Sequence, residues 1–175
     1  MLCWNNRNRW WFFCIFARFN QSGMYLIDTH THLYDPAFDL DRPEAVQRAL
    51  DAGVGMLLLP NVDASTIDPM LEMHEQFPDC TRMMMGLQPE EVKADYKQVL
   101  AVMEKALEKP SYIGVGEIGL DFYWDASFEK EQLDATFSAV YTSAGSNDSF
   151  VITHTNSLGR TSVDTVCTAL AEIFN

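Results

Sequence analysis

From residue 24 onward, short apolar runs alternate with stretches whose apolar residues recur at helical spacing. The run at residues 54–60 is continuously apolar, which is typical of a strand buried on both faces of a sheet. The pattern predicts strands at residues 25–29, 54–60, 82–87, 112–116 and 150–153.

The segments between these runs carry apolar residues on one helical face. Pro43 lies in the first turn of the first such segment, where proline is well tolerated, and Gly53 ends it. The spacing predicts helices over residues 42–52, 67–77, 96–107, 129–141 and 162–174. Repeated strand–helix units call for a parallel sheet with right-handed crossovers. We therefore expect an α/β fold with about five such units, where a closed barrel has eight.

Polar residues with catalytic potential follow four of the five predicted strands. In parallel α/β folds, active sites gather at the carboxyl ends of the strands. His30 and His32 follow the first strand, Gln88 the third, Glu117 the fourth and His154 the fifth. We therefore expect these side chains to share one end of the sheet.

The two histidines form a His-x-His pair directly after the first strand. Side chains at i and i+2 of a strand point to the same face, so His30 and His32 can reach one metal ion. Imidazole suits zinc and its first-row neighbours. The alternative is a pair of surface histidines with no special role.

Glu117 lies among the glycines of the segment 114–119. Its carboxylate could bridge two cations, with one oxygen for each, as in sites that hydrolyse phosphodiesters with two metal ions. A helix-capping or salt-bridged acid is the other interpretation. Asp121 could orient such a site from behind or could equally cap a loop.

Composition narrows the function further. The chain has 175 residues, 47% of them hydrophobic, and a formal net charge of −13. That charge argues against a nonspecific grip on nucleic acid by a basic surface, although metal ions can still meet a phosphate. The four cysteines are widely scattered, as in a reduced cytoplasmic protein, so we expect a cytoplasmic location.

Residues 1–23 differ from the rest, with three arginines, no acidic residue and an aromatic run at 10–17. The run is too short to span a bilayer, and the residues after it make a poor signal-peptide cleavage site. We expect a non-native or disordered leader at 1–23 that supplies no strand or helix, with Met24 as an alternative start. A membrane-surface anchor is the other possibility.

Residues 24 to about 133 resemble the N-terminal portion of a TatD-type metal-dependent hydrolase, of the TatD deoxyribonuclease family. The resemblance rests on the motifs at residues 27–33, 59–63, 86–90 and 114–123. It implies a TIM-type barrel of the amidohydrolase kind and two divalent ions (Mg, Mn or Zn). It also implies hydrolysis of phosphodiester bonds in DNA, often from the 3′ end. By that resemblance His30 and His32 ligate one ion and Glu117 bridges both.

The chain departs from the family pattern at several places. Gln88 stands where the family has His; glutamine can hydrogen-bond a phosphate but cannot carry a proton. His154 is the candidate ligand of the second ion, although the family's neighbouring Arg is replaced by Asn156. The family's later His ligand, its late Asp and three strands have no counterpart before Asn175. We therefore expect residues 24–175 to form a partial, C-terminally truncated hydrolase domain.

Three functions remain open at the level of sequence. The first is a DNA-cleaving phosphodiesterase with Glu117 in the catalytic site and Gln88 contacting substrate. The second keeps the metal site but acts on small amides or esters, and the third is an inactive remnant. DNA is the expected partner; the sequence indicates no stable membrane association and identifies no protein partner.

Overall fold

The computed structural model describes residues 15–20, 23–107, 112–123, 125–144, 150–156 and 166–167. Seven strands form one sheet in chain order. The strands β2 to β6 run parallel, and an antiparallel strand pairs with each edge of this set. The strands are β1 (Ile15–Asn20), β2 (Gly23–Asp28), β3 (Val54–Pro60), β4 (Thr81–Met85), β5 (Tyr112–Asp121), β6 (Phe150–Asn156) and β7 (Val166–Cys167).

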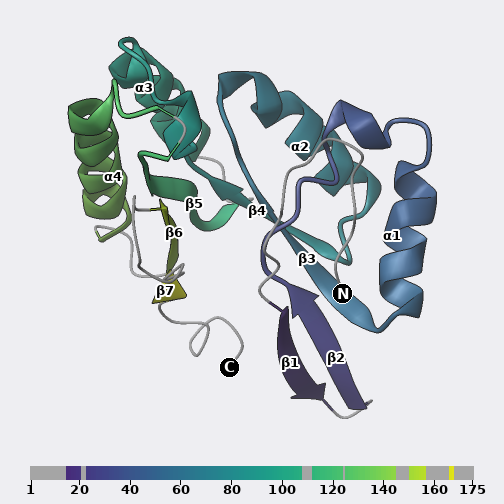
Figure 1. Cartoon of the computed structure of the whole chain (residues 1–175). Coiled ribbons are helices and arrows are strands. Elements are labelled where there is room, and N and C mark those ends of the chain that lie inside the picture. The colour runs from purple at the N-terminus through teal and green to yellow at the C-terminus, as the bar shows by residue number, and fades with distance from the viewer. Residues whose placement is uncertain are drawn as a thin grey trace.

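Helices follow the strands β2 to β5, and Figure 1 shows them as an outer arc around the curled sheet. The α-helices are α1 (Arg42–Asp51), α2 (Ile67–Gln76), α3 (Tyr96–Leu107) and α4 (Glu129–Ala144). Short 3-10 helices precede the first three of them: η1 (Pro36–Phe38), η2 (Ala64–Thr66) and η3 (Pro89–Glu91). The predicted α/β fold with a parallel sheet is confirmed.

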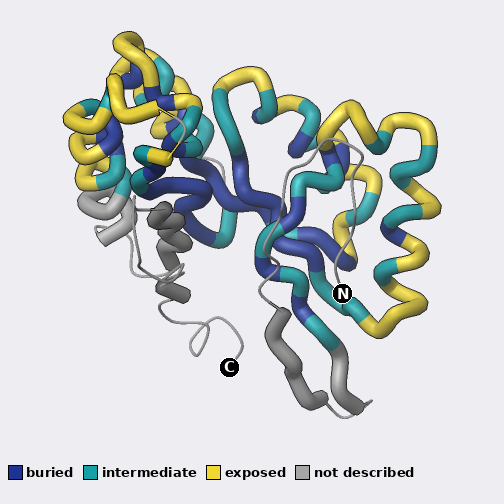
Figure 2. The backbone as a smooth tube through the Cα atoms, in the orientation of Figure 1, coloured by how far each residue is buried: buried dark blue, intermediate teal, exposed yellow. Residues whose placement is uncertain are grey.

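The main core lies between the helices and the sheet. Leu57, Leu59, Met83 and Met85 face the helices, while Leu58 packs in a separate cluster on the opposite face. Because successive strand residues alternate between faces, burial of both sets requires a continuously apolar strand, as predicted for 54–60. Figure 2 shows this buried band along the strands, with exposed residues on the outer sides of the helices.

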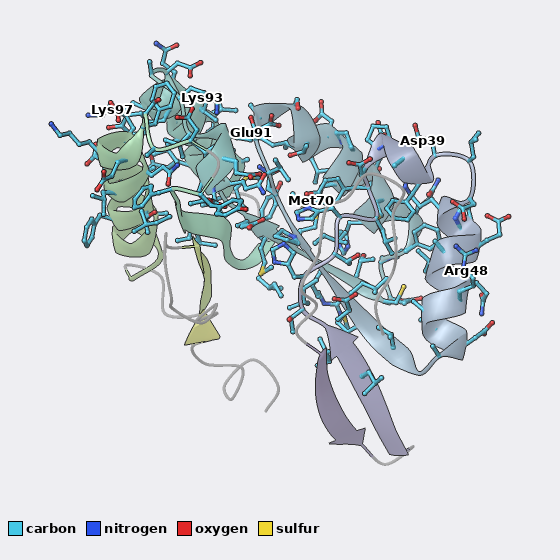
Figure 3. The ribbon with its side chains drawn as sticks, viewed as in Figure 1. Asp39, Arg48, Met70, Glu91, Lys93 and Lys97 are labelled. Carbon is cyan, nitrogen blue, oxygen red and sulfur yellow. The ribbon has the colours of Figure 1, made fainter. Side chains whose placement is uncertain are left out.

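The helices present a polar outer surface. Met70, on α2, is fully buried beneath its helix, whereas Asp39, Arg48, Lys93 and Lys97 are exposed (Figure 3). No helix in the described part of the chain is long and apolar enough to cross a membrane.

The structure extends the fourth predicted strand. That strand was expected to end at residue 116, but β5 continues to Asp121. It pairs with β4 as far as Val115, whereas its pairing with β6 begins at Gly114 and, after a register shift, continues from Ile118 to Asp121. Glu117 is therefore inside β5, just beyond the end of β4, and not after the strand. The continued pairing with β6, a long-range contact, is the physical reason.

The prediction that residues 1–23 supply no strand is wrong for residues 15–20. These form β1, which pairs antiparallel with β2 from Ile15 opposite Asp28 to Asn20 opposite Gly23. The edge of β2 away from β3 offers unpaired N–H and C=O groups, and β1 satisfies them. Residues 1–14 lie outside the described residues, and the leader's origin and a start at Met24 stay predictions.

The predicted C-terminal helix at 162–174 is also wrong where it can be compared. Val166 and Cys167 form β7, paired with Thr153 and Ile152 of β6. The spacing of apolar residues in this segment is compatible with a helix or a strand. The open edge of β6 favours strand pairing at these two positions. The remainder of 162–174 lies outside the described residues.

Candidate metal centre

Three predicted site residues come together beyond the ends of β2 and β4. The Nε2 atoms of His30 and His32 are 3.0 Å apart. The Oε2 atom of Glu117 lies 3.3 Å from His30 Nε2 and 3.7 Å from His32 Nε2. Glu117 is only 3% exposed, and both histidines are partly buried. Among the described residues, this is the group of histidine, cysteine and acidic side chains placed to hold a metal ion.

Backbone contacts hold the histidine segment against its neighbours. The N–H of His30 donates to Asp28 Oδ1 at 3.2 Å, and the N–H of Thr31 donates to Leu58 O at 3.1 Å. The alternation of a strand therefore persists past the end of β2, and both imidazoles face the same way. Burial raises the pKa of Asp28 to about 6, even though the neighbouring His30 opposes the shift.

Asn61 ties the ends of three strands together and supports Glu117. It is fully buried, and its carbonyl oxygen accepts from the N–H of Glu117 at 3.2 Å. Its Nδ2 donates to the carbonyl oxygens of Asp63 and Gly86, and its Oδ1 accepts from the Thr66 hydroxyl. A buried amide with all these partners rigidifies its surroundings. We had not predicted this role, although a polar residue directly after a buried apolar run is a usable signal.

Gly86 allows β5 to approach the end of β4 closely. A Cβ atom built on Gly86 would lie 2.5 Å from the backbone oxygen of Glu117. Only glycine fits this contact, so the backbone that carries Glu117 depends on it.

Tyr34 lies behind His32 and is 2% exposed. Its hydroxyl is 2.6 Å from His32 Nδ1 and also donates to the carbonyl oxygen of Pro60. Burial, reinforced by the negative charge of Glu117, raises the pKa of Tyr34 far above its ordinary value. The hydroxyl therefore keeps its proton at any physiological pH.

Of the other candidates, Gln88 and Asp121 are not part of the described cluster. Gln88 is half-buried and caps η3, and its N–H donates to Val62 O at 2.8 Å. His154 lies on β6 opposite Gly119, but its side chain is outside the described part of the structure. The carboxylate of Asp121 accepts from the N–H of Tyr123 at 2.8 Å. This contact fits the second of its two predicted roles, which is to cap a loop. The proposed roles of Gln88 and His154 stay predictions.

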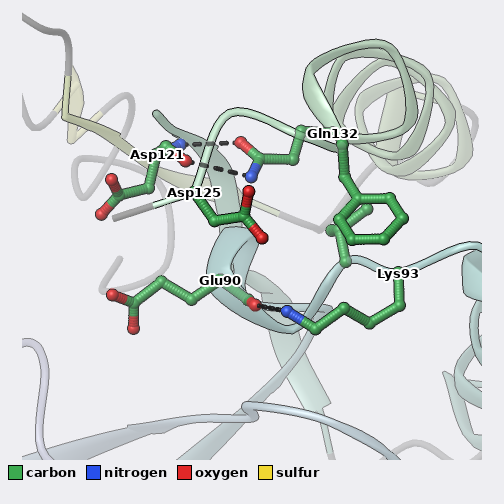
Figure 4. A pocket seen from close by; sticks show the side chains of 7 residues that line it. Glu90, Lys93, Asp121, Asp125 and Gln132 are labelled. Atoms are coloured by element: carbon green, nitrogen blue, oxygen red, sulfur yellow. Dashed lines mark hydrogen bonds between the residues drawn. The ribbon is translucent and has the colours of Figure 1, made fainter. Parts of the chain in front are cut away.

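A separate pocket of about 170 Å³ opens between η3, the end of β5 and the start of α4 (Figure 4). Lys93 donates to the backbone oxygen of Glu90 and lies 5.7 Å from the centre of the Phe128 ring. The Gln132 amide bonds the backbone N–H and C=O of Asp121, at 2.8 and 3.0 Å. The lining residues are Glu90, Val92, Lys93, Asp121, Asp125, Phe128 and Gln132. None of the three cluster residues lines this pocket.

The structure has a curled parallel sheet with outer helices, and a His-x-His/Glu cluster lies at the carboxyl ends of its strands. This combination defines a class of protein. It is the arrangement of metal-dependent hydrolases built on βα barrels. The family model described as TatD related DNase matches residues 27–172, and the chain belongs to this family.

Individual relatives agree with this assignment. The chain is 34% identical over 109 residues to the "Uncharacterized metal-dependent hydrolase YjjV" of Escherichia coli K12, covering 61% of this chain and 42% of that protein. It is 27% identical over 107 residues to the "3'-5' ssDNA/RNA exonuclease TatD" of Erwinia tasmaniensis, covering 61% and 41%. The crystal structure of YjjV superposes with a TM-score of 0.61 at 30% identity, covering 66% of this chain and 45% of the other. The fold is thus of the TIM-barrel type, and the chain spans less than half the length of these relatives.

Proposed function

We propose that this chain is a metal-dependent hydrolase whose ions are held by His30, His32 and Glu117. The observation that carries the proposal is the convergence of two Nε2 atoms and a carboxylate oxygen within 3.0–3.7 Å. Atoms that each lie about 2.0–2.2 Å from one ion are separated by roughly 3–4 Å. Two imidazoles and one carboxylate are also the protein ligands of several catalytic zinc sites. The residues therefore fit a divalent ion such as Zn, Mn or Mg.

For the reaction, we propose hydrolysis of phosphodiester bonds in DNA, from the 3′ end. A divalent ion in such a site lowers the pKa of bound water and polarises a phosphoryl oxygen. The second carboxylate oxygen of Glu117 would contact a second ion, for which His154 is the proposed further ligand. Gln88, next to the same end of the sheet, would hydrogen-bond a phosphate oxygen of the substrate.

The substrate proposal draws support from relatives named as ssDNA/RNA exonucleases. With a net charge of −13, the chain would meet a phosphate through bound ions and not through a basic surface. We also propose a cytoplasmic location, because Cys80 is a free, buried thiol and the cysteines have no disulfide spacing.

A second candidate is a metal-binding form that does not catalyse. Gln88 favours it, since an amide cannot exchange a proton with a substrate or water during hydrolysis. A third, hydrolysis of small amides or esters, needs the same metal site with another substrate.

One experiment separates these candidates. Single-stranded DNA labelled at its 5′ end is incubated with the full chain and Mg²⁺, Mn²⁺ or Zn²⁺, while ion binding is followed by calorimetry. We expect ion-dependent shortening from the 3′ end, lost in the double variant His30→Ala, His32→Ala. Binding without shortening, and without hydrolysis of small esters, would establish the non-catalytic form. Equal activity in the double variant would refute the site.

A further inference from the structure

Behind the candidate metal centre, Tyr34 connects His32 to the end of β3. The Tyr34 hydroxyl is 2.6 Å from His32 Nδ1, and the two rings meet edge to face at an interplanar angle of 84°. The same hydroxyl donates to the carbonyl oxygen of Pro60, the last residue of β3. Arg42 holds this segment from α1, because its guanidinium donates to the backbone oxygens of Leu33 and Tyr34.

His32, the Tyr34 hydroxyl and the Pro60 carbonyl form a series of hydrogen bonds. When His32 is neutral, this series allows one arrangement of protons. A carbonyl oxygen can only accept, so the single hydroxyl proton of Tyr34 points to Pro60. The hydroxyl must then accept from His32, which places a proton on His32 Nδ1. A neutral imidazole carries one proton, so His32 Nε2 carries a lone pair and no proton. Nε2 is the atom that faces His30 and Glu117.

We propose that Tyr34 is a positioning residue that fixes His32 in the Nδ1-protonated tautomer, with the Nε2 lone pair directed into the metal centre. The proposed benefit to metal binding rests on the proposed function, whereas the tautomer itself does not. Metal-bound histidines commonly donate their other N–H to a carboxylate or carbonyl group. Here a buried tyrosine takes that place and passes the interaction on to a backbone carbonyl.

The opposite tautomer of His32, protonated at Nε2, would have two unfavourable consequences. If His32 Nδ1 were the acceptor, the hydroxyl proton would turn away from Pro60 and leave that buried carbonyl without its donor. The proton on Nε2 would also point toward the atoms that should share an ion. Both consequences favour the Nδ1-protonated form.

The first test uses the metal-free full chain, labelled with ¹⁵N, in mildly alkaline buffer where imidazoles are neutral. Long-range ¹H–¹⁵N correlations report which ring nitrogen carries the proton. We expect a protonated Nδ1 for His32, and a mixture of tautomers in Tyr34→Phe. A wild-type His32 protonated at Nε2 would overturn the proposal, whether or not the variant folds.

The second test measures Zn²⁺ affinity in the same samples. Tyr34→Phe should weaken binding by about ten- to a hundredfold, as is typical when the partner of a ligating histidine is removed. Tyr112→Phe is the matched control, because Tyr112 is another tyrosine whose buried hydroxyl has no hydrogen-bond partner among the described residues. Its affinity should be unchanged, with far-ultraviolet circular dichroism confirming that both variants fold.

The outcomes separate this proposal from the proposed function. An affinity of Tyr34→Phe within twofold of wild type would overturn the positioning role while leaving the metal site intact. A wild-type chain that binds no ion would overturn the proposed function and the metal-binding benefit together. The tautomer result would still stand or fall on the spectrum of His32.

Discussion

Replacing Gly86 with alanine should displace the backbone that carries Glu117 in the candidate metal centre. The added Cβ would lie 2.5 Å from the Glu117 oxygen, 2.7 Å from the Gly116 carbon and 3.0 Å from the Glu117 carbon. All three atoms are backbone, so no side chain can rotate away. Reaching even a tight 3.0 Å contact with the oxygen requires a movement of 3.0 − 2.5 = 0.5 Å. Metal–ligand distances tolerate only about 0.2 Å, so the carboxylate of Glu117 should lose its position.

We expect Gly86→Ala to lower the free energy of unfolding by about 1–3 kcal/mol, the usual cost of overpacking. Zn²⁺ affinity should fall at least tenfold, which corresponds to about 1.4 kcal/mol. Urea denaturation and calorimetric titration measure the two quantities.

Gly53→Ala provides the matched control for this prediction. Gly53 has a φ of +89° but no atom within 4 Å of its added Cβ, and it lies at the other end of β3 from the cluster. Alanine there should cost stability through backbone strain without weakening Zn²⁺ binding. If Gly86→Ala kept wild-type stability and affinity, the argument from close approach would be refuted.

Three further predictions concern other parts of the fold. Asn61→Ala should lower the free energy of unfolding in urea by about 2–4 kcal/mol, because it leaves several buried groups without hydrogen-bond partners. A loss below about 1 kcal/mol would contradict the stabilising role of Asn61. Deleting residues 1–23 should lower the unfolding midpoint and cause association through the exposed edge of β2, because β1 pairs with that edge. Denaturation measures the midpoint and light scattering measures association. An unchanged midpoint and a monomeric chain would show that β1 is dispensable. In the metal-free chain, Asp28 keeps its proton to about pH 6 when folded but only to about 3.8 when unfolded. Stability relative to Asp28→Asn should therefore fall, by up to about 3 kcal/mol, as pH rises through that window, and parallel pH profiles would argue against the shift.

Local patterns in the sequence were enough to predict most of the elements and the heart of the site. Apolar runs and helical spacing are properties of neighbouring residues, so the strands β2 to β6 and the helices α1 to α4 could be predicted, mostly with small shifts at their ends. The exception is β5, which continues to Asp121 beyond its predicted end at residue 116. The convergence of His30, His32 and Glu117 followed from two rules, alternation along a strand and the gathering of polar residues at strand ends.

Only the tertiary structure decided how those residues are held. The Tyr34 hydroxyl meets a carbonyl 26 residues away, and the backbone of Gly86 makes room for Glu117 on a neighbouring strand. The pairing of β1 with β2 and of β7 with β6 depends on which strand edges the folded sheet leaves open. Such contacts join segments that are far apart in the sequence, and the local pattern of either segment does not indicate its partner. The sequence determined which groups could bind a metal ion, whereas long-range packing determined their orientation.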